Sequence, residues 1–99
     1  MKFVQIIEFT TSKADEVAKL DEDWIAATKG KTTATRVLRC VDRNDPTRQF
    51  TIVEFPSYDA AMKNSEMPET GAMAEKMAAL CDGPPTFYDL DVTESRDLG

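Results

Sequence analysis

The sequence predicts an α+β domain of the ferredoxin-like βαββαβ class, with an antiparallel sheet of strand order 4-1-3-2 and the helices on one face. Three observations indicate this fold: four segments with strand-like patterns, two regions with helical periodicity, and turn or stop signals between them. The 99 residues provide room for one domain. We expect that domain to span residues 1–93 and residues 94–99 to form a flexible acidic tail.

The first strand and the first helix follow from local patterns. Residues 2–10 carry apolar side chains on both alternating faces, which is typical of a strand that is covered on both sides. Residues 12–29 show helical periodicity, with an apolar stripe that reaches Trp24. Ser12 is expected to cap the start of this helix, and Gly30 is expected to end it.

A hairpin is predicted from residues 33–42 and 48–55, joined by a five-residue loop rich in turn-forming residues. Its register follows from opposite charges that bracket an apolar centre, because a slip of one residue would turn every side chain to the other face. The expected charge pairs are Asp42 with Arg48 and Arg36 with Glu54.

A second helical region and a last strand complete the order. Ser57 is expected to cap a short helix over residues 57–65. Pro68 interrupts the region and suits the first turn of a second piece that runs to about Cys81. Residues 86–93 alternate apolar and polar side chains, which predicts a half-exposed strand.

Composition excludes several classes of function. The formal net charge of −6 disfavours nucleic acid and anionic membrane surfaces as partners. The N-terminus resembles neither a signal peptide nor a transmembrane segment, so we expect a cytoplasmic location. With no histidine and two separated cysteines, no metal site is expected.

The sheet is expected to have a partner on the face without helices. The first three strands are apolar on both faces, and a monomer would leave an apolar patch in water. A homodimer that stacks sheet on sheet would bury it. A ligand or another protein on this face is the alternative.

The stretch from Val53 to Asn64, VEFPSYDAAMKN, is similar to the third strand, corner and short helix of the dimeric α/β-barrel superfamily. The chain resembles its antibiotic-biosynthesis-monooxygenase-like (ABM-like) domains over nearly its whole length, with further likeness at Pro68 and at residues 80–84. The resemblance implies a dimeric barrel with a pocket between sheet and helices. It also implies cofactor-independent oxidation of aromatic metabolites. The haem-degrading members use an Asn, a Trp and a His, and the absence of histidine argues against that activity here.

Eight residues are candidate contacts for a small hydrophobic ligand: Gln5, Trp24, Arg39, Tyr58, Met62, Asn64, Met73 and Met77. Each has a structural alternative. Arg39 could bind a ligand carboxylate or phenolate, or form a salt bridge at an edge or interface. Gln5 could be a satisfied buried amide. Tyr58 and Asn64 could face solvent or cap a helix, and the methionines could be ordinary core.

Two clusters of acidic residues are expected to be exposed to solvent and to have no role in a site. The run Asp21–Asp23 is expected to be a solvated face of the first helix, although the apolar stripe of that helix must pass through either Leu20 or Asp21. Asp89 and Asp91 are expected to be exposed on the last strand.

Two functions remain open from the sequence. The first is a homodimer that binds a small hydrophobic or aromatic metabolite, with cofactor-independent monooxygenation as the reaction that the resemblance implies. The alternative is a non-catalytic dimerisation or ligand-sensing module, which the absence of histidine and of a catalytic triad favours.

Overall fold

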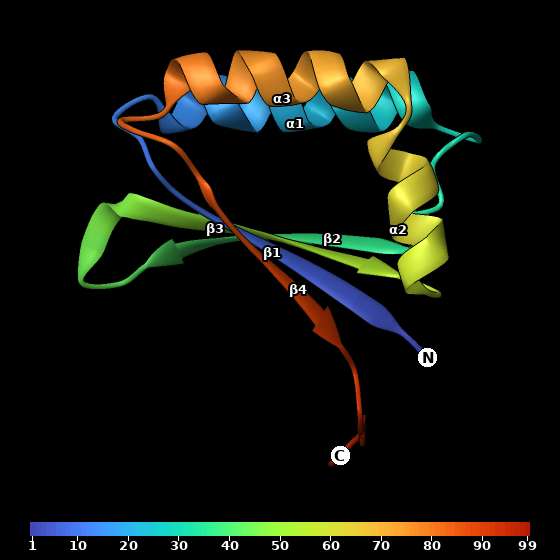
Figure 1. Cartoon of the computed structure of the whole chain (residues 1–99). Helices are drawn as coiled ribbons and strands as arrows, with labels where there is room; N and C mark the ends of the chain where they lie inside the picture. The colour runs from blue at the N-terminus through green and yellow to red at the C-terminus, as the bar shows by residue number, and fades with distance from the viewer.

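A computed structural model describes residues 1–99 and shows four strands and three helices. The elements in chain order are β1 (Phe3–Thr10), α1 (Ala14–Thr28), β2 (Arg36–Asp42), β3 (Asp45–Phe55), α2 (Tyr58–Ser65), α3 (Pro68–Leu80) and β4 (Thr86–Asp91). The strands form one antiparallel sheet of order β2-β3-β1-β4, which confirms the predicted order and fold class. Helices α1 and α3 lie next to each other above one face, and α2 connects the end of the sheet to the start of α3 (Figure 1).

The hairpin register is confirmed from Arg36 opposite Glu54 to Cys40 opposite Phe50. The five-residue loop is wrong, because β3 begins at Asp45 and a register shift after Val41 places Asp45 opposite Asp42. A bulge takes up the difference in length. Two turns stabilise this end, in which the carboxylates of Asp42 and Asp45 accept hydrogen bonds from backbone N–H groups two residues ahead.

The start of α1 differs from the prediction. Ser12 is exposed, the cap position is Lys13, and no side chain caps the helix. The buried hydroxyl of Thr11 takes the structural role, because it donates to the carbonyl of Leu80 at 2.6 Å and accepts from the N–H of Lys13 at 3.0 Å. The Thr11 hydroxyl therefore ties the start of α1 to the end of α3 at the same end of the sheet. Tertiary contact therefore overrides the local capping signal at Ser12.

The other helix ends agree with the sequence. The Ser57 hydroxyl accepts a hydrogen bond from the N–H of Ala60 at 3.1 Å, as expected of a cap. Pro68 occupies the first turn of α3. Gly30 follows α1 with a φ of 82°, a left-handed conformation that glycine adopts without strain.

The core is divided into two clusters. One lies beneath α2 and contains Phe3, Val53, Phe55 and Ala61. The other lies beneath α1 and α3 and contains Phe9, Val17 and Met77. Phe3 and Phe9 stand at opposite ends of β1 on the same face, and between them Ile7 packs against the second cluster, whereas Gln5 belongs to neither.

The face of the sheet away from the helices is uncovered in the single chain (Figure 1), and we call it the open face. Register places eight apolar side chains there: Val4, Ile6, Leu38, Cys40, Phe50, Ile52, Tyr88 and Leu90. Charged pairs stand at both ends of this apolar strip. Glu54 pairs with Lys2 and Arg36 at one end, and Arg48 pairs with Glu8 and Asp42 at the other. None of the helices is both long and apolar enough to cross a membrane.

The role of Thr11 leads to a test. Thr11→Val keeps the shape of the side chain and removes both hydrogen bonds, so we expect it to lower the free energy of unfolding by about 1–3 kcal/mol. Ser12→Ala, next to it in sequence, should change that free energy by less than about 0.5 kcal/mol. Urea denaturation followed by circular dichroism measures both. A larger loss for Ser12→Ala than for Thr11→Val would restore Ser12 as the cap.

Candidate functional site

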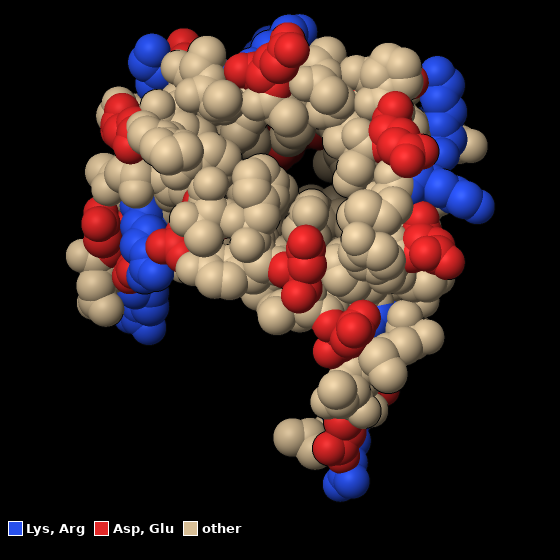
Figure 2. Space-filling view, in the orientation of Figure 1, with Lys and Arg blue, Asp and Glu red and all other residues tan.

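A cavity occupies the gap between the two core clusters. Its inner part has a volume of about 70 Å³ and lies between the sheet and α1. Its outer part, about 220 Å³, lies between the sheet and α3. The two parts adjoin, because they share five lining residues: Gln5, Ile7, Thr51, Thr70 and Met73. Figure 2 shows its mouth as a hollow between the upper and lower layers of the molecule.

The floor of the inner part comes from alternate residues of three strands, and Phe87 of β4 adds to the outer part. Gln5 and Ile7 of β1 face the helices because they share the face of Phe3 and Phe9. Thr51 and Val53 of β3 pair with them across the sheet. Val37 of β2 extends the floor toward the edge. The period-2 pattern of the strands therefore positions the entire floor.

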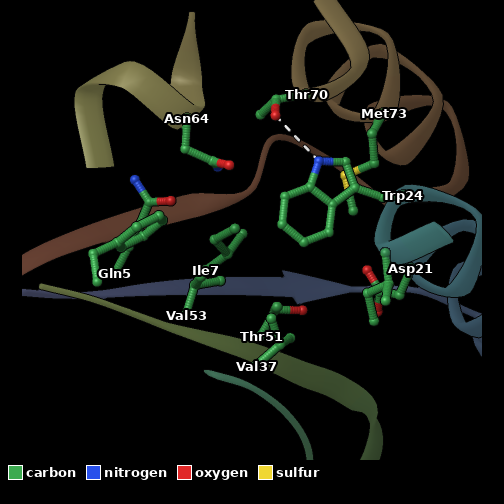
Figure 3. A pocket seen from close by; sticks show the side chains of 12 residues that line it. Gln5, Ile7, Asp21, Trp24, Val37, Thr51, Val53, Asn64, Thr70 and Met73 are labelled. Carbon is green, nitrogen blue, oxygen red and sulfur yellow. Dashed lines mark hydrogen bonds between the residues drawn. The ribbon is translucent and has the colours of Figure 1, made fainter. Parts of the chain in front are cut away.

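Trp24 forms the roof. It lies on α1, and its indole N–H donates a hydrogen bond to the hydroxyl of Thr70 on α3 at 3.1 Å. This bond links the two helices and fixes the plane of the ring above the strands (Figure 3). Met73 of α3 lines the same wall. A flat aromatic surface, a flexible thioether and apolar strand residues suit a small apolar ligand.

One end of the inner cavity carries an ion pair. Asp21 of α1 is only 4% exposed, and its Oδ2 lies 3.1 Å from the Nε of Arg39 on β2. Burial raises the pKa of Asp21, and the charge of Arg39 opposes the rise without cancelling it. The expectation that Asp21 belongs to a solvated face is wrong. The carboxylate turns inward with the apolar stripe, whereas Glu22 and Asp23 are exposed.

The other end carries two amides. Asn64 is buried, and its Oδ1 accepts a hydrogen bond from the Thr32 hydroxyl at 2.7 Å. Gln5 donates through Nε2 to Asp89 at 3.2 Å. In Figure 3 these two amides lie on the opposite side of the cavity from Asp21, with the Trp24 ring between them.

The structure brings four of the eight predicted contacts together around the inner cavity, namely Gln5, Trp24, Asn64 and Met73, and Met77 lines the outer part. The other three lie elsewhere. Arg39 stands behind Asp21 and forms the salt bridge that was its structural alternative. Tyr58 packs edge-on against Phe3, with ring centroids 5.4 Å apart. Met62 packs against the core cluster beneath α2.

The sequence analysis did not predict three polar residues that line the inner cavity: Asp21, Thr51 and Thr70. A signal existed for Asp21, which lies three residues before Trp24 and therefore on the same helical stripe. The charges around it favoured a solvated face instead. Thr51 and Thr70 carry no comparable signal, because threonine is common in strands and helices of any exposure.

The ion pair leads to a test of stability. Asp21→Asn should raise the free energy of unfolding at neutral pH, because the buried charge is disfavoured and Arg39 can remain hydrated. The pKa of Asp21 is higher in the folded than in the unfolded chain, so the cost of its charge vanishes as the pH falls through the folded pKa to below the unfolded value of about 3.9.

The advantage of Asp21→Asn should therefore shrink as the pH falls from 7 toward about 4, which urea titrations at several pH values will measure. Glu22→Gln, the same kind of exchange at an exposed position of α1, serves as the control and should be nearly neutral. A variant Asp21→Asn that is less stable than the wild-type chain at neutral pH would contradict the account.

Among known proteins, only solved structures are similar to this chain. No protein-family model matches the sequence, and no curated protein is similar to it. Among solved structures, an antibiotic biosynthesis monooxygenase superposes with a TM-score of 0.75 at 20% identity, covering 95% of this chain and 100% of the other. SnoaB from Streptomyces nogalater, described as a cofactor-independent oxygenase, gives a TM-score of 0.81 at 14% identity, with 95% of each chain covered.

A conserved protein from Methanosarcina mazei Go1 is also similar, with a TM-score of 0.81 at 9% identity and 91% of each chain covered. Because these sequence identities are low and nearly the whole of each chain superposes, the similarity establishes the fold. The chain therefore has the fold of the antibiotic biosynthesis monooxygenase domains, as the likeness of its sequence implied.

Proposed function

We propose that the chain binds a small hydrophobic or aromatic molecule in the cavity between sheet and helices, and that it does so as a homodimer. The observation that carries the proposal is the cavity itself. It interrupts the core of a domain in which only 13 of 99 residues are buried, although filling the gap with apolar side chains would stabilise the fold.

The shape and polarity of the cavity indicate the ligand. Trp24 and Met73 offer a flat and an adaptable apolar surface, and Ile7 and Val53 face them from the strands. Asn64 and Asp21 stand at the two ends, and the hydroxyls of Thr51 and Thr70 lie on the floor and beside the roof between them. An elongated, flat molecule with an apolar body and polar ends complements this arrangement.

Oxygenation without a cofactor is the reaction that we propose for such a ligand. Its support is the shared fold with SnoaB, which is described as a cofactor-independent oxygenase. A substrate phenolate would supply the electrons to dioxygen. For an anthrone-type phenol, the methylene carbon becomes a carbonyl, one oxygen atom of O₂ enters the product and the other leaves as water. The amides of Gln5 and Asn64 would orient the polar end of the substrate.

A second candidate is a ligand-sensing module that performs no chemistry. It is favoured by the absence of histidine and of a catalytic triad. Dithranol, an anthrone-type phenol, distinguishes the two candidates. An oxygen electrode should record uptake faster than uncatalysed oxidation for an oxygenase, whereas a sensing module would bind dithranol without such uptake.

The homodimer is supported by the open face. Its apolar strip joins all four strands, and its charged side chains are already paired within the chain. Hydrogen bonds from Arg48 and Tyr88 lower the pKa of Glu8, which keeps that carboxylate charged and bonded. A surface with an apolar centre and internally satisfied charges can approach a second copy at a small desolvation cost.

Cavity binding has a matched pair of variants on α3. Ala74 lines the outer cavity, whereas Ala72 is exposed and lines neither part. Ala74→Phe should obstruct the cavity and weaken the binding of dithranol by at least about tenfold, and Ala72→Phe should have little effect. The reporter is the indole N–H signal of Trp24, the only tryptophan, in NMR titrations. An unshifted indole signal in the wild-type chain, or equal binding by both variants, would contradict the assignment of the cavity.

The dimer has a matched pair on β2. Leu38 lies in the apolar strip of the open face, and Val41 is exposed on the opposite face of the same strand. Leu38→Lys should shift the chain from dimer to monomer in sedimentation experiments at micromolar concentration, because it buries an unpaired charge at the interface. Val41→Lys should remain dimeric. A wild-type chain that sediments as a monomer would refute the homodimer.

A further inference from the structure

The inner part of the cavity holds two buried polar atoms without a hydrogen-bond partner. They are Oδ2 of Asp21 and Oγ1 of Thr51, and both residues are 4% exposed. Asp21 Oδ2 lies near the Arg39 Nε at 3.1 Å, but the contact has the geometry of an ion pair and not that of a hydrogen bond. Buried polar atoms are almost always bonded, so two such atoms on residues that line one cavity require an explanation.

The two residues are linked through Arg39, which neighbours both. Thr51 stands opposite Arg39 in the register of β2 and β3, on the face that bears the helices. Arg39 in turn contacts Asp21 from α1. Both Asp21 and Thr51 line the inner cavity, whereas Arg39 does not. Figure 3 shows Thr51 on the floor beneath Trp24, between Asp21 on one side and the amides of Gln5 and Asn64 on the other.

The chemistry of these two residues is that of a hydrogen-bond acceptor and a hydroxyl. An ionised carboxylate only accepts, and a threonine hydroxyl both donates and accepts. The positive charge of Arg39 lies behind the carboxylate and balances it, so a cationic ligand is not required. A ligand carboxylate or phosphate would meet the negative oxygen of Asp21 first. A neutral O–H group fits: it donates to Asp21 and accepts from Thr51.

We propose that Asp21 and Thr51 form an anchor for one hydroxyl group of an aromatic ligand, and that this anchor makes the cavity select hydroxylated rings over their methylated or unsubstituted forms. The inference rests on the proposed ligand binding and names the ligand group that the inner end recognises. The hydroxylated ring would lie beneath Trp24, and the rest of the molecule would extend into the outer part, past Met77 and Phe87.

Arg39 is a positioning residue in this arrangement. It is 40% exposed and lies outside the cavity, so it does not touch the ligand. Its guanidinium opposes the rise in the pKa of Asp21 that burial causes, and so favours the ionised carboxylate, which is the better acceptor. The unfavourable burial of Asp21 is consistent with a binding role, because a leucine at this position would fill the corner without an unpaired oxygen.

The test compares three ligands that differ at one group: β-naphthol, its methyl ether and naphthalene. Calorimetric titration of the full chain should give β-naphthol an affinity about tenfold higher than that of either analogue, the effect of a hydrogen bond to a charged acceptor. Asp21→Asn and Thr51→Val preserve shape, and each should reduce this preference to about threefold or less. Asp91→Asn and Thr86→Val, the same exchanges at exposed positions of β4 outside the cavity, should leave the preference intact.

The possible outcomes distinguish failure of the proposed anchor from failure of ligand binding in the cavity. Equal binding of β-naphthol and its methyl ether to the wild-type chain would overturn the anchor while leaving the cavity as a binding site, with water bonding to the two atoms. A preference that persists in both Asp21→Asn and Thr51→Val would also overturn it, because the hydroxyl would then be recognised elsewhere. If the wild-type chain binds none of the three ligands, the proposed function falls and the anchor falls with it. Circular dichroism of each variant confirms that the fold is retained.

Discussion

The division of the core into two clusters is the constraint on which the rest of this structure depends. Phe3 and Phe9 stand at the two ends of the same face of β1, and each is the centre of a separate cluster. The short helix α2 connects the end of the sheet to the helix layer (Figure 1), and the cavity lies between the two clusters. The residues between the two phenylalanines on this face are Gln5 and Ile7, and neither replaces the bulk of an aromatic ring between the clusters. The cavity therefore follows from where the large side chains are placed.

Stability and function oppose each other at the inner end of the cavity. The carboxylate of Asp21 is buried, its pKa is raised by burial, and Arg39 compensates for only part of the cost. Thr51 adds an unpaired hydroxyl beside it. Unsatisfied buried groups of this kind each cost about 1–3 kcal/mol, which is a sizeable fraction of the stability of a small domain. Natural domains tolerate such costs mainly where a binding or catalytic site requires them.

The charged residues are arranged differently on the two faces of the sheet. On the open face the charges stand at the ends and bond to one another, as Arg48 does with Glu8 and Asp42. On the helix face the single ion pair of the cavity is partly buried, between elements that are distant in sequence. The first arrangement leaves a neutral apolar centre that suits association with a second copy. The second places polarity at a defined point inside the molecule, where it can orient a ligand.

Patterns local in sequence determined the order of elements, the central register of the hairpin and the cap at Ser57, because strand alternation, charge pairing and capping act over a few residues. The resemblance to the ABM-like domains implied a pocket between sheet and helices, and five of the eight candidate residues line the cavity there. The tertiary structure decided the contacts between elements that are distant in sequence. Thr11 took the place of Ser12 because its hydroxyl reaches the end of α3, and Asp21 turned inward because Arg39 comes from β2 to meet it. No local pattern encodes such a contact, since its energy depends on two elements that packing alone brings together.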